Sequence, residues 1–347
     1  MPRHQGAIPS HSPKKSLPPP SDGINISLPP QTKPTPYAPA EADGTGARIK
    51  GLTDIRPLQS IAGMENMEAL RQQHPLLFTI DVEDYFHIIG VSGTPPVSTW
   101  DSLPGRVEYG LRALFELLGR HHAKATLFFL GYMAKRYPHL VREANALGHE
   151  IASHGMSHEE VNTLGRERFL QDAEGSRKLL EDICSREVWG WRSAGFSVDE
   201  GTPWFFDTLL KAGYFYDSSL VPTRRDHREL FGAEAFPAML GSGIYEFPVG
   251  VADVLGNKLN MFGGGYLRFF PAPLVEQMAR RTLARRPLVV YIHPREMDSG
   301  HPRVRMNLYR RFKSYVNMDS VPGKLERLLN LARCETLGSF YEASKAI

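Results

Sequence analysis

The sequence predicts an α/β domain built on a parallel sheet, because strand-like and helix-like segments alternate from residue 74 onward. Repeated strand–helix units within one domain favour parallel strands. Polar residues also follow several of the expected strands, notably Asp81, His154, Arg192, Asp217 and His293. Both (β/α) barrels and open doubly wound sheets place their active sites at this end of the strands. The pattern leaves both architectures open, although no GxGxxG motif follows the first strand, which argues against a dinucleotide site.

The expected strands are short apolar runs that end at a polar or turn residue. The first covers residues 76–80 (LLFTI) and ends at Asp81, as a buried parallel strand would. The others cover residues 125–130, 149–153, 188–191, 214–216, 244–249 and 288–293.

The expected helices have apolar residues at helical spacing and recognisable ends. Gly119 and Gly148 are placed to end the first two, and Pro203 is placed to begin the fourth. Helices are predicted over residues 107–118, 132–147, 169–183, 203–212, 273–285, 324–331 and 339–346.

Residues 1–70 differ in composition from the rest of the chain. Proline recurs among Ser, Gly and Ala, as in residues 18–20 and 29–36. Such a segment cannot bury enough apolar surface to offset its chain entropy, so we expect a disordered tail before a catalytic domain over residues 71–347. A polyproline docking segment is the alternative, and a translation start at Met64 or Met67 would remove the tail altogether.

Composition excludes several classes of protein. The formal net charge is +3 and no basic helix with interleaved aromatic residues is present, so nucleic acid is not an expected partner. Cys184 and Cys334 lie far apart, which argues for free thiols rather than a disulfide framework. No apolar run is long enough for a transmembrane helix. No signal peptide is recognisable either, so the sequence predicts a cytoplasmic protein.

A metal site is indicated by two histidines and a group of carboxylates. His154 and His158 are four residues apart, a spacing that puts both on one face of a helical turn. Two histidines, one carboxylate and an open position describe a catalytic zinc site, and Co²⁺, Ni²⁺ or Mn²⁺ would also suit these ligands. Glu83 is the favoured carboxylate because it shares a strand face with Asp81, and Asp84 is the alternative.

Together these motifs resemble the polysaccharide deacetylases of the NodB-homology type (carbohydrate esterase family 4), and within them the branch found in bacterial exopolysaccharide loci. The matching segments are residues 79–87 (TIDVEDYFH), 124–129 (KATLFF), 148–155 (GHEIASHG), 262–266 (FGGGY) and 291–294 (YIHP). The resemblance implies a distorted (β/α)7 barrel and a metal-dependent hydrolase that removes N-acetyl groups from acetamido sugars.

The resemblance also implies roles for individual residues. Asp81 would be the general base, and His293 the acid that protonates the leaving amine. Arg192 would orient the catalytic carboxylate through charge-assisted hydrogen bonds, and Asp217 would tune the catalytic histidine. His154 and His158 match the metal-binding pair of the family.

A glycine-rich segment, residues 261–268, carries an aromatic residue of interest. We expect it to form a loop that lines a sugar groove, with Tyr266 stacking on a sugar ring. A tight turn before the next helix is the alternative. The segment lacks the GxxxxGK[ST] pattern of a phosphate-binding loop.

The leading hypothesis is therefore N-deacetylation of a polysaccharide or its precursor, with an N-acetylated carbohydrate as the partner. One alternative is a metal-dependent amidohydrolase of a small amide or ureide, and another is a catalytically silent carbohydrate-binding relative. The presence of Asp81, His154, His158 and His293 argues against a silent relative. The sugar, the linkage and the oligomeric state are not fixed by the sequence.

Overall fold

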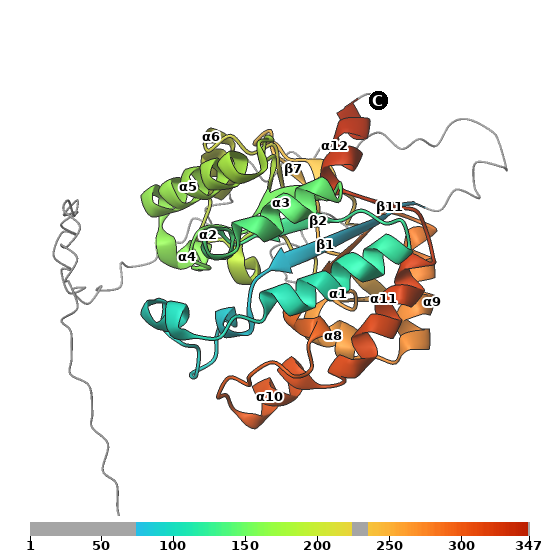
Figure 1. Ribbon diagram of the computed structural model, residues 1–347. Helices are drawn as coiled ribbons and strands as arrows, with labels where there is room; N and C mark the ends of the chain where they lie inside the picture. Colours follow the sequence, from blue (N-terminus) through green and yellow to red (C-terminus); the bar gives the residue numbers. More distant parts are fainter. Residues whose placement is uncertain (1–73, 224–234, 346–347) are drawn as a thin grey trace, which may run out of the picture. The chain divides into compact units, whose positions relative to one another are not determined.

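A computed structural model describes residues 74–223 and 235–345, which form a curled, mostly parallel sheet covered by helices (Figure 1). This architecture confirms the predicted distorted barrel. The sheet runs β10-β1-β2-β3-β4-β5-β7-β6, and β11 also pairs with β1. All pairings in it are parallel except that of β6 with β7. The proposed tail over residues 1–70 lies outside the described residues.

The strands of this sheet are β1 (Leu76–Val82), β2 (Thr126–Phe129), β3 (Glu150–Ser153), β4 (Gly190–Trp191), β5 (Tyr216–Asp217), β6 (Ala238–Met239), β7 (Tyr245–Glu246), β10 (Leu288–Ile292) and β11 (Cys334–Glu335), and β8 (Ala252–Val254) and β9 (Asn257–Leu259) form a separate hairpin. The helices are α1 (Val107–Arg120), α2 (Gly131–Arg136), α3 (Pro138–Ala146), α4 (Val161–Leu164), α5 (Arg166–Cys184), α6 (Phe205–Lys211), α8 (Gly264–Phe269), α9 (Ala272–Leu283), α10 (Leu308–Tyr315), α11 (Val321–Leu329) and α12 (Leu337–Lys345).

A backbone hydrogen bond joins β10, at one end of the strand path, to the segment that follows β7 near the other end. The Gly250 N–H donates to the carbonyl of Val289 in β10, over 2.9 Å. A Cβ on Gly250 would lie 2.4 Å from that same oxygen, so only glycine allows this approach. The curled sheet is therefore joined by a loop contact rather than by a full strand ladder.

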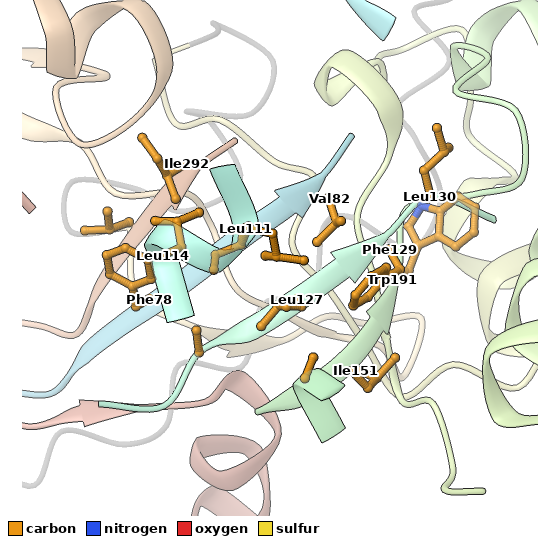
Figure 2. Close-up of a cluster of buried hydrophobic side chains, with 14 of the residues drawn as sticks. Phe78, Val82, Leu111, Leu114, Leu127, Phe129, Leu130, Ile151, Trp191 and Ile292 are labelled. Atoms are coloured by element: carbon orange, nitrogen blue, oxygen red, sulfur yellow. The ribbon is translucent and has the colours of Figure 1, made fainter. Parts of the chain in front are cut away.

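The outer face of the sheet packs against helices to form the main apolar core (Figure 2). Successive side chains of a strand point to opposite faces, so Phe78 and Val82 of β1 both point to this outer face. There they lie in one cluster with Leu111 and Leu114 of α1. All four are essentially inaccessible to solvent, and burying each such side chain contributes about 1.5–3 kcal/mol to folding.

The inner face of the sheet carries a second, smaller apolar cluster, which Leu77, Phe128 and Val289 form with Leu337 and Tyr341 of α12. Leu77 and Val289 lie near the first residues of β1 and β10, whereas Phe128 of β2 lies beside Asp81. Beyond Leu77, the inward positions of β1 carry Thr79 and Asp81, so the opposite end is polar.

Some predicted elements are wrong in extent. The helix expected over residues 132–147 is two helices, α2 and α3, because Pro138 cannot continue α2 and Tyr137 before it leaves the helical conformation, with φ −133° and ψ 60°. The strands expected at residues 214–216 and 244–249 are the two-residue strands β5 and β7. Sequence periodicity missed α4, α10, β6 and β11, which are short.

The glycine-rich segment is not the expected loop throughout, because residues 264–269 form helix α8. A Cβ on Gly263 would lie 2.1 Å from the Tyr291 ring, and the backbone of Gly263 bridges to that residue of β10. Here the glycines allow α8 to begin directly against the barrel strand.

Two further predictions concern the chain as a whole. Both cysteines are free, as expected. In the described part of the chain, no helix is both long and apolar enough to cross a membrane.

Candidate active site and metal centre

The candidate residues lie where parallel strands end. Asp81 is near the end of β1, His154 follows β3, Arg192 follows β4, Asp217 ends β5 and His293 follows β10. Their side chains are buried or nearly so. This is the end of a (β/α) barrel at which active sites are built.

Glu83, His154 and His158 form a group that could hold a metal ion. Each offers one ligand atom, and these atoms all lie within 4.8 Å of one another. Oε2 of Glu83 is 2.7 Å from Nε2 of His158, yet it is buried without a hydrogen bond of acceptable geometry. Carboxylate oxygen and imidazole nitrogen are both ligands that Zn²⁺ accepts, so the pair could contribute two of the ligands of a metal site.

The imidazole of His154 is in the neutral form, with one ring nitrogen available to bind a metal ion. Its Nδ1 lies 2.8 Å from the carbonyl of Arg192, which can only accept, so Nδ1 carries the proton and Nε2 keeps its lone pair. Burial lowers the pKa of His154 to about 4. The ring is therefore uncharged at neutral pH, as a metal ligand must be.

The loop of residues 154–158 differs from the helical turn that the spacing suggested. No helix is present there, and Gly155 and His158 have φ values of +78° and +57°. The Gly155 carbonyl accepts from the Gly131 N–H at 2.7 Å, and the Met156 N–H donates to the Asp172 carboxylate. The two histidines converge because tertiary hydrogen bonds shape this loop, so the predicted helical turn was wrong.

Unlike Glu83, Asp84 uses its carboxylate to hold the backbone. Its carboxylate accepts the backbone N–H groups of Tyr85 at 2.8 Å, Arg106 at 2.6 Å and Val107 at 2.9 Å. These bonds hold the first residues of α1 against the end of β1. Among the described residues, the group with metal-ligand spacing contains Glu83 and not Asp84.

Asp81 is held by a fully buried arginine. Nη1 of Arg192 donates to Oδ1 of Asp81 at 2.8 Å and to Oγ1 of Thr79 at 2.7 Å. Its Nε and Nη2 donate to the carbonyl and hydroxyl oxygens of Ser218, and the guanidinium lies 4.2 Å from the centre of the Phe128 ring. With these contacts the guanidinium has no freedom to turn, and it fixes the orientation of the Asp81 carboxylate.

His293 lies between the carboxylates of the site. Its Nε2 is 3.4 Å from Oε1 of Glu83 and 3.9 Å from Oδ2 of Asp81, and its Nδ1 is 2.7 Å from Oε1 of Glu296. Burial raises the pKa of Glu296, but the Arg268 charge and the His293 hydrogen bond outweigh it and bring the pKa to about 2. Glu296 therefore stays ionised and orients the ring of His293.

Sequence reasoning missed Glu296. It stands three residues after His293, at the third position of the 3-10 helix Pro294–Met297, and its carboxylate also accepts the His293 N–H at 3.3 Å. A Glu three residues beyond a helix-capping residue is a recognisable pattern, so this signal was present in the sequence.

Asp217 is fully buried, and its carboxylate hydrogen bonds with Ser219, over 2.6 Å, and with Glu246. Burial raises the pKa of Asp217 to about 6, and burial beside Asp217 raises the pKa of Glu246 further. The two acids share a proton, and any role of Asp217 towards His293 stays a prediction.

Tyr266 lies on α8 with 40% of its surface exposed. The Lys313 ammonium is 4.9 Å from the centre of its ring. A sugar-binding role for Tyr266 stays a prediction.

Two family profiles match the chain in succession. The profile of the polysaccharide deacetylases matches residues 93–210, which include His154, His158 and Arg192. A domain of unknown function (DUF3473) matches residues 218–342, which include His293. Asp81 and Glu83 precede both matches.

Curated relatives match a shorter part of the chain. A chitooligosaccharide deacetylase of Sinorhizobium fredii is 36% identical over 104 residues, which cover 29% of this chain and 47% of that protein. A peptidoglycan-N-acetylglucosamine deacetylase of Bacillus cereus is 25% identical over 130 residues, which cover 38% of this chain and 46% of that protein. The matches thus span about half the length of these relatives.

Solved structures share the fold over a longer stretch. A candidate polysaccharide deacetylase from Mycobacterium smegmatis superposes with a TM-score of 0.54 at 16% identity, over 84% of this chain and 96% of that one. An allantoinase superposes with a TM-score of 0.51 at 14% identity, over 78% of this chain and 90% of that one. At such identities the likeness concerns the fold alone. Together with the profile match over residues 93–210, the shared fold supports a relation to the polysaccharide deacetylases of the NodB type.

Proposed function

We propose that this protein is a metal-dependent N-deacetylase of acetamido sugars. The observation that carries the proposal is the meeting of three groups at one end of the barrel. The Glu83–His154–His158 group, the Asp81–Arg192 pair and the His293–Glu296 pair are linked by the short distances from His293 to Asp81 and Glu83. Activated water, a base and an acid are what amide hydrolysis requires.

Glu83, His154 and His158 would hold one divalent ion, for which Zn²⁺ is the first choice. Two neutral imidazoles and one carboxylate suit Zn²⁺, and Co²⁺, Ni²⁺ or Mn²⁺ could replace it. When bound, the ion would supply Lewis acidity toward the amide carbonyl and lower the pKa of water.

The side chains around this group would manage the protons. Asp81 takes a proton from water as its oxygen bonds to the acetyl carbon, and Arg192 keeps the Asp81 carboxylate aimed at that water. His293 gives a proton to the sugar nitrogen as the C–N bond breaks, so that acetate and a free amine leave. Glu296 at Nδ1 of His293 keeps the ring oriented and stabilises its charged form.

We infer a carbohydrate polymer or oligomer as the substrate class. The matched relatives are described as acting on chitooligosaccharide and on peptidoglycan N-acetylglucosamine. An exopolysaccharide or its precursor is the substrate that the sequence motifs favour.

The test is acetate release from N-acetylglucosamine oligomers, with ammonia release from ureides measured in parallel. Wild type should release acetate, with a bell-shaped pH profile. Asp81→Asn and His293→Ala should each lose at least about a hundredfold in rate. Glu342→Gln, which removes an exposed carboxylate from α12, is the control and should be unaffected. Ammonia release without acetate release would instead favour an amidohydrolase of small ureides.

A further inference from the structure

Helix α10 has no buried residue, although it carries several large apolar side chains. Leu308 is 83% exposed, Tyr309 72% and Phe312 54%. Short helices are marginal in water and normally gain stability by burying an apolar face. An apolar face that points outward therefore needs a different explanation.

Polar and backbone contacts hold α10 in place. The side chain of Asn307 caps the helix by accepting the Arg310 N–H at 2.9 Å. Nη2 of Arg268 in α8 donates to the Lys313 carbonyl at 3.0 Å. A Cβ on Gly265 would lie 2.8 Å from the same carbonyl, so glycine lets α8 and α10 approach closely. The apolar side chains are left free to face outward.

The exposed apolar side chains continue onto the neighbouring helix. Phe269 of α8 is 52% exposed, and its ring centre lies 6.1 Å from that of Phe312. We call Phe269, Leu308, Tyr309 and Phe312 the α10 surface. Contiguous exposed apolar side chains on a protein commonly mark a binding surface.

The segment that carries this surface is strongly basic. Residues 299–320 contain Asp319 as their one acidic residue, against the basic residues Arg303, Arg305, Arg310, Arg311 and Lys313. The side chains of Arg303, Arg305 and Arg311 are exposed. Cationic side chains beside exposed Leu and Phe are the pattern of helices that lie in the interface of an anionic membrane.

We propose that the α10 surface docks the protein on an anionic lipid bilayer. Phe312 and Leu308 would enter the boundary between headgroups and acyl chains, and Arg305 and Arg311 would contact lipid phosphates. Pairing of this surface with a second copy would bring like charges together, which opposes a symmetric dimer. A neutral sugar chain would gain little from Leu308, which has no ring to stack on and is the most exposed residue of the surface.

The docking geometry concerns the active site as well. Nη2 of Arg310 donates to the Gly90 carbonyl at 3.1 Å, and Gly90 lies on the segment that leads away from Glu83. A bilayer bound at α10 would therefore lie beside a segment that emerges from the polar end of the barrel. The lipid proposal does not depend on the deacetylase proposal, because the binding assay needs no turnover.

The test is cosedimentation of the full chain with vesicles of phosphatidylcholine alone or with about a third of phosphatidylglycerol. Wild type should bind the anionic vesicles at least about tenfold more tightly, and salt should weaken that binding. Phe312→Ser and Arg311→Glu should each lower the affinity about tenfold. Leu255→Ser is the control, because Leu255 is 98% exposed but lies on the β8–β9 hairpin, outside the α10 surface.

Several outcomes would overturn the proposal. The proposal is wrong if wild type binds neutral and anionic vesicles equally well. It is also wrong if Phe312→Ser and Arg311→Glu both bind anionic vesicles as tightly as wild type does. Retention on an insoluble N-acetylated polymer that Phe312→Ser abolishes, with no vesicle binding, would reassign the surface to sugar. A wild-type dimer in analytical ultracentrifugation that Phe312→Ser dissociates, again without vesicle binding, would reassign it to self-association. Circular dichroism spectra that match wild type would show that both variants are folded.

Discussion

Removing the charge of Arg192 should destabilise the fold as well as the catalytic centre. In Arg192→Met the carboxylate of Asp81 stays buried but loses its 2.8 Å partner, and the hydrogen bonds to Ser218 are lost as well. Both side chains of the pair are at most 3% exposed, so water cannot replace the lost contacts. Breaking such a buried pair from one side costs about 3–5 kcal/mol. We expect the free energy of unfolding to fall by that amount.

Urea denaturation at pH 7 measures this change, and a double-mutant cycle identifies its cause. Asp81→Asn alone leaves the guanidinium without its counter-charge, whereas the double variant Asp81→Asn/Arg192→Met leaves neither charge unpaired. The double variant should therefore cost at least about 1 kcal/mol less than the sum of the two single variants. A loss below about 1 kcal/mol in Arg192→Met, or additive single losses, would refute the view that the pair acts as one buried unit.

Two further predictions concern a buried acid and a helix contact. Burial raises the pKa of Asp217 to about 6 from an ordinary value near 3.8, so the folded state holds this proton more tightly, and stability should fall by about 2 kcal/mol as the pH rises from 4 to 6. Denaturation curves at pH 4.5 and pH 7 give the difference in the free energy of unfolding between these two conditions. Asp217→Asn should make that difference smaller, and an unchanged difference would contradict a proton shared by Asp217 and Glu246. Gly110→Ala should cost about 1–3 kcal/mol because its Cβ would lie 1.9 Å from the Pro294 carbonyl, whereas Gly119→Ala in the same helix meets no atom within 4 Å and should be neutral or stabilising. Thermal unfolding of both alanine variants compares them, and equal losses would show that the Pro294 contact is unimportant.

Much of the fold follows from local pattern. The apolar run before Asp81 predicted β1, and the run before His293 predicted β10, because strands buried on both faces read as continuous apolar segments. The order of these strands around the barrel does not follow from pattern. Pairing of β1 with β10 joins residues more than two hundred positions apart, and a contact of that kind leaves no local trace in the sequence.

The candidate site divides in the same way. Asp81, Glu83 and His154 could be named because they lie at or just after the carboxyl ends of strands, which meet at one end of the barrel. The loop that turns His158 back toward Glu83 could not be derived, because its shape depends on Asp172 of α5 and Gly131 of α2. The choice between Glu83 and Asp84 could not be made from the sequence either, because both are neighbouring carboxylates. Only the structure shows that the Asp84 carboxylate accepts hydrogen bonds from three backbone N–H groups.

Helix α10 was missed for a physical reason. Its apolar residues recur at helical spacing, but the segment has only eight residues, four of them polar, and its apolar face packs on no core. Two turns of helix are a short window in which to recognise periodicity, and helices of this length are marginal without tertiary packing.

Metal content of the purified protein is the decisive measurement for a metal centre at Glu83, His154 and His158. Elemental analysis of wild type should find about one divalent ion per chain, as expected for a site of two histidines and one carboxylate. His154→Ala and Glu83→Ala should lose the ion and the release of acetate together, while Asp84→Ala should keep the ion and lose stability. Equal metal content in wild type, His154→Ala and Glu83→Ala, or acetate release that survives complete removal of metal, would contradict a metal centre at Glu83, His154 and His158.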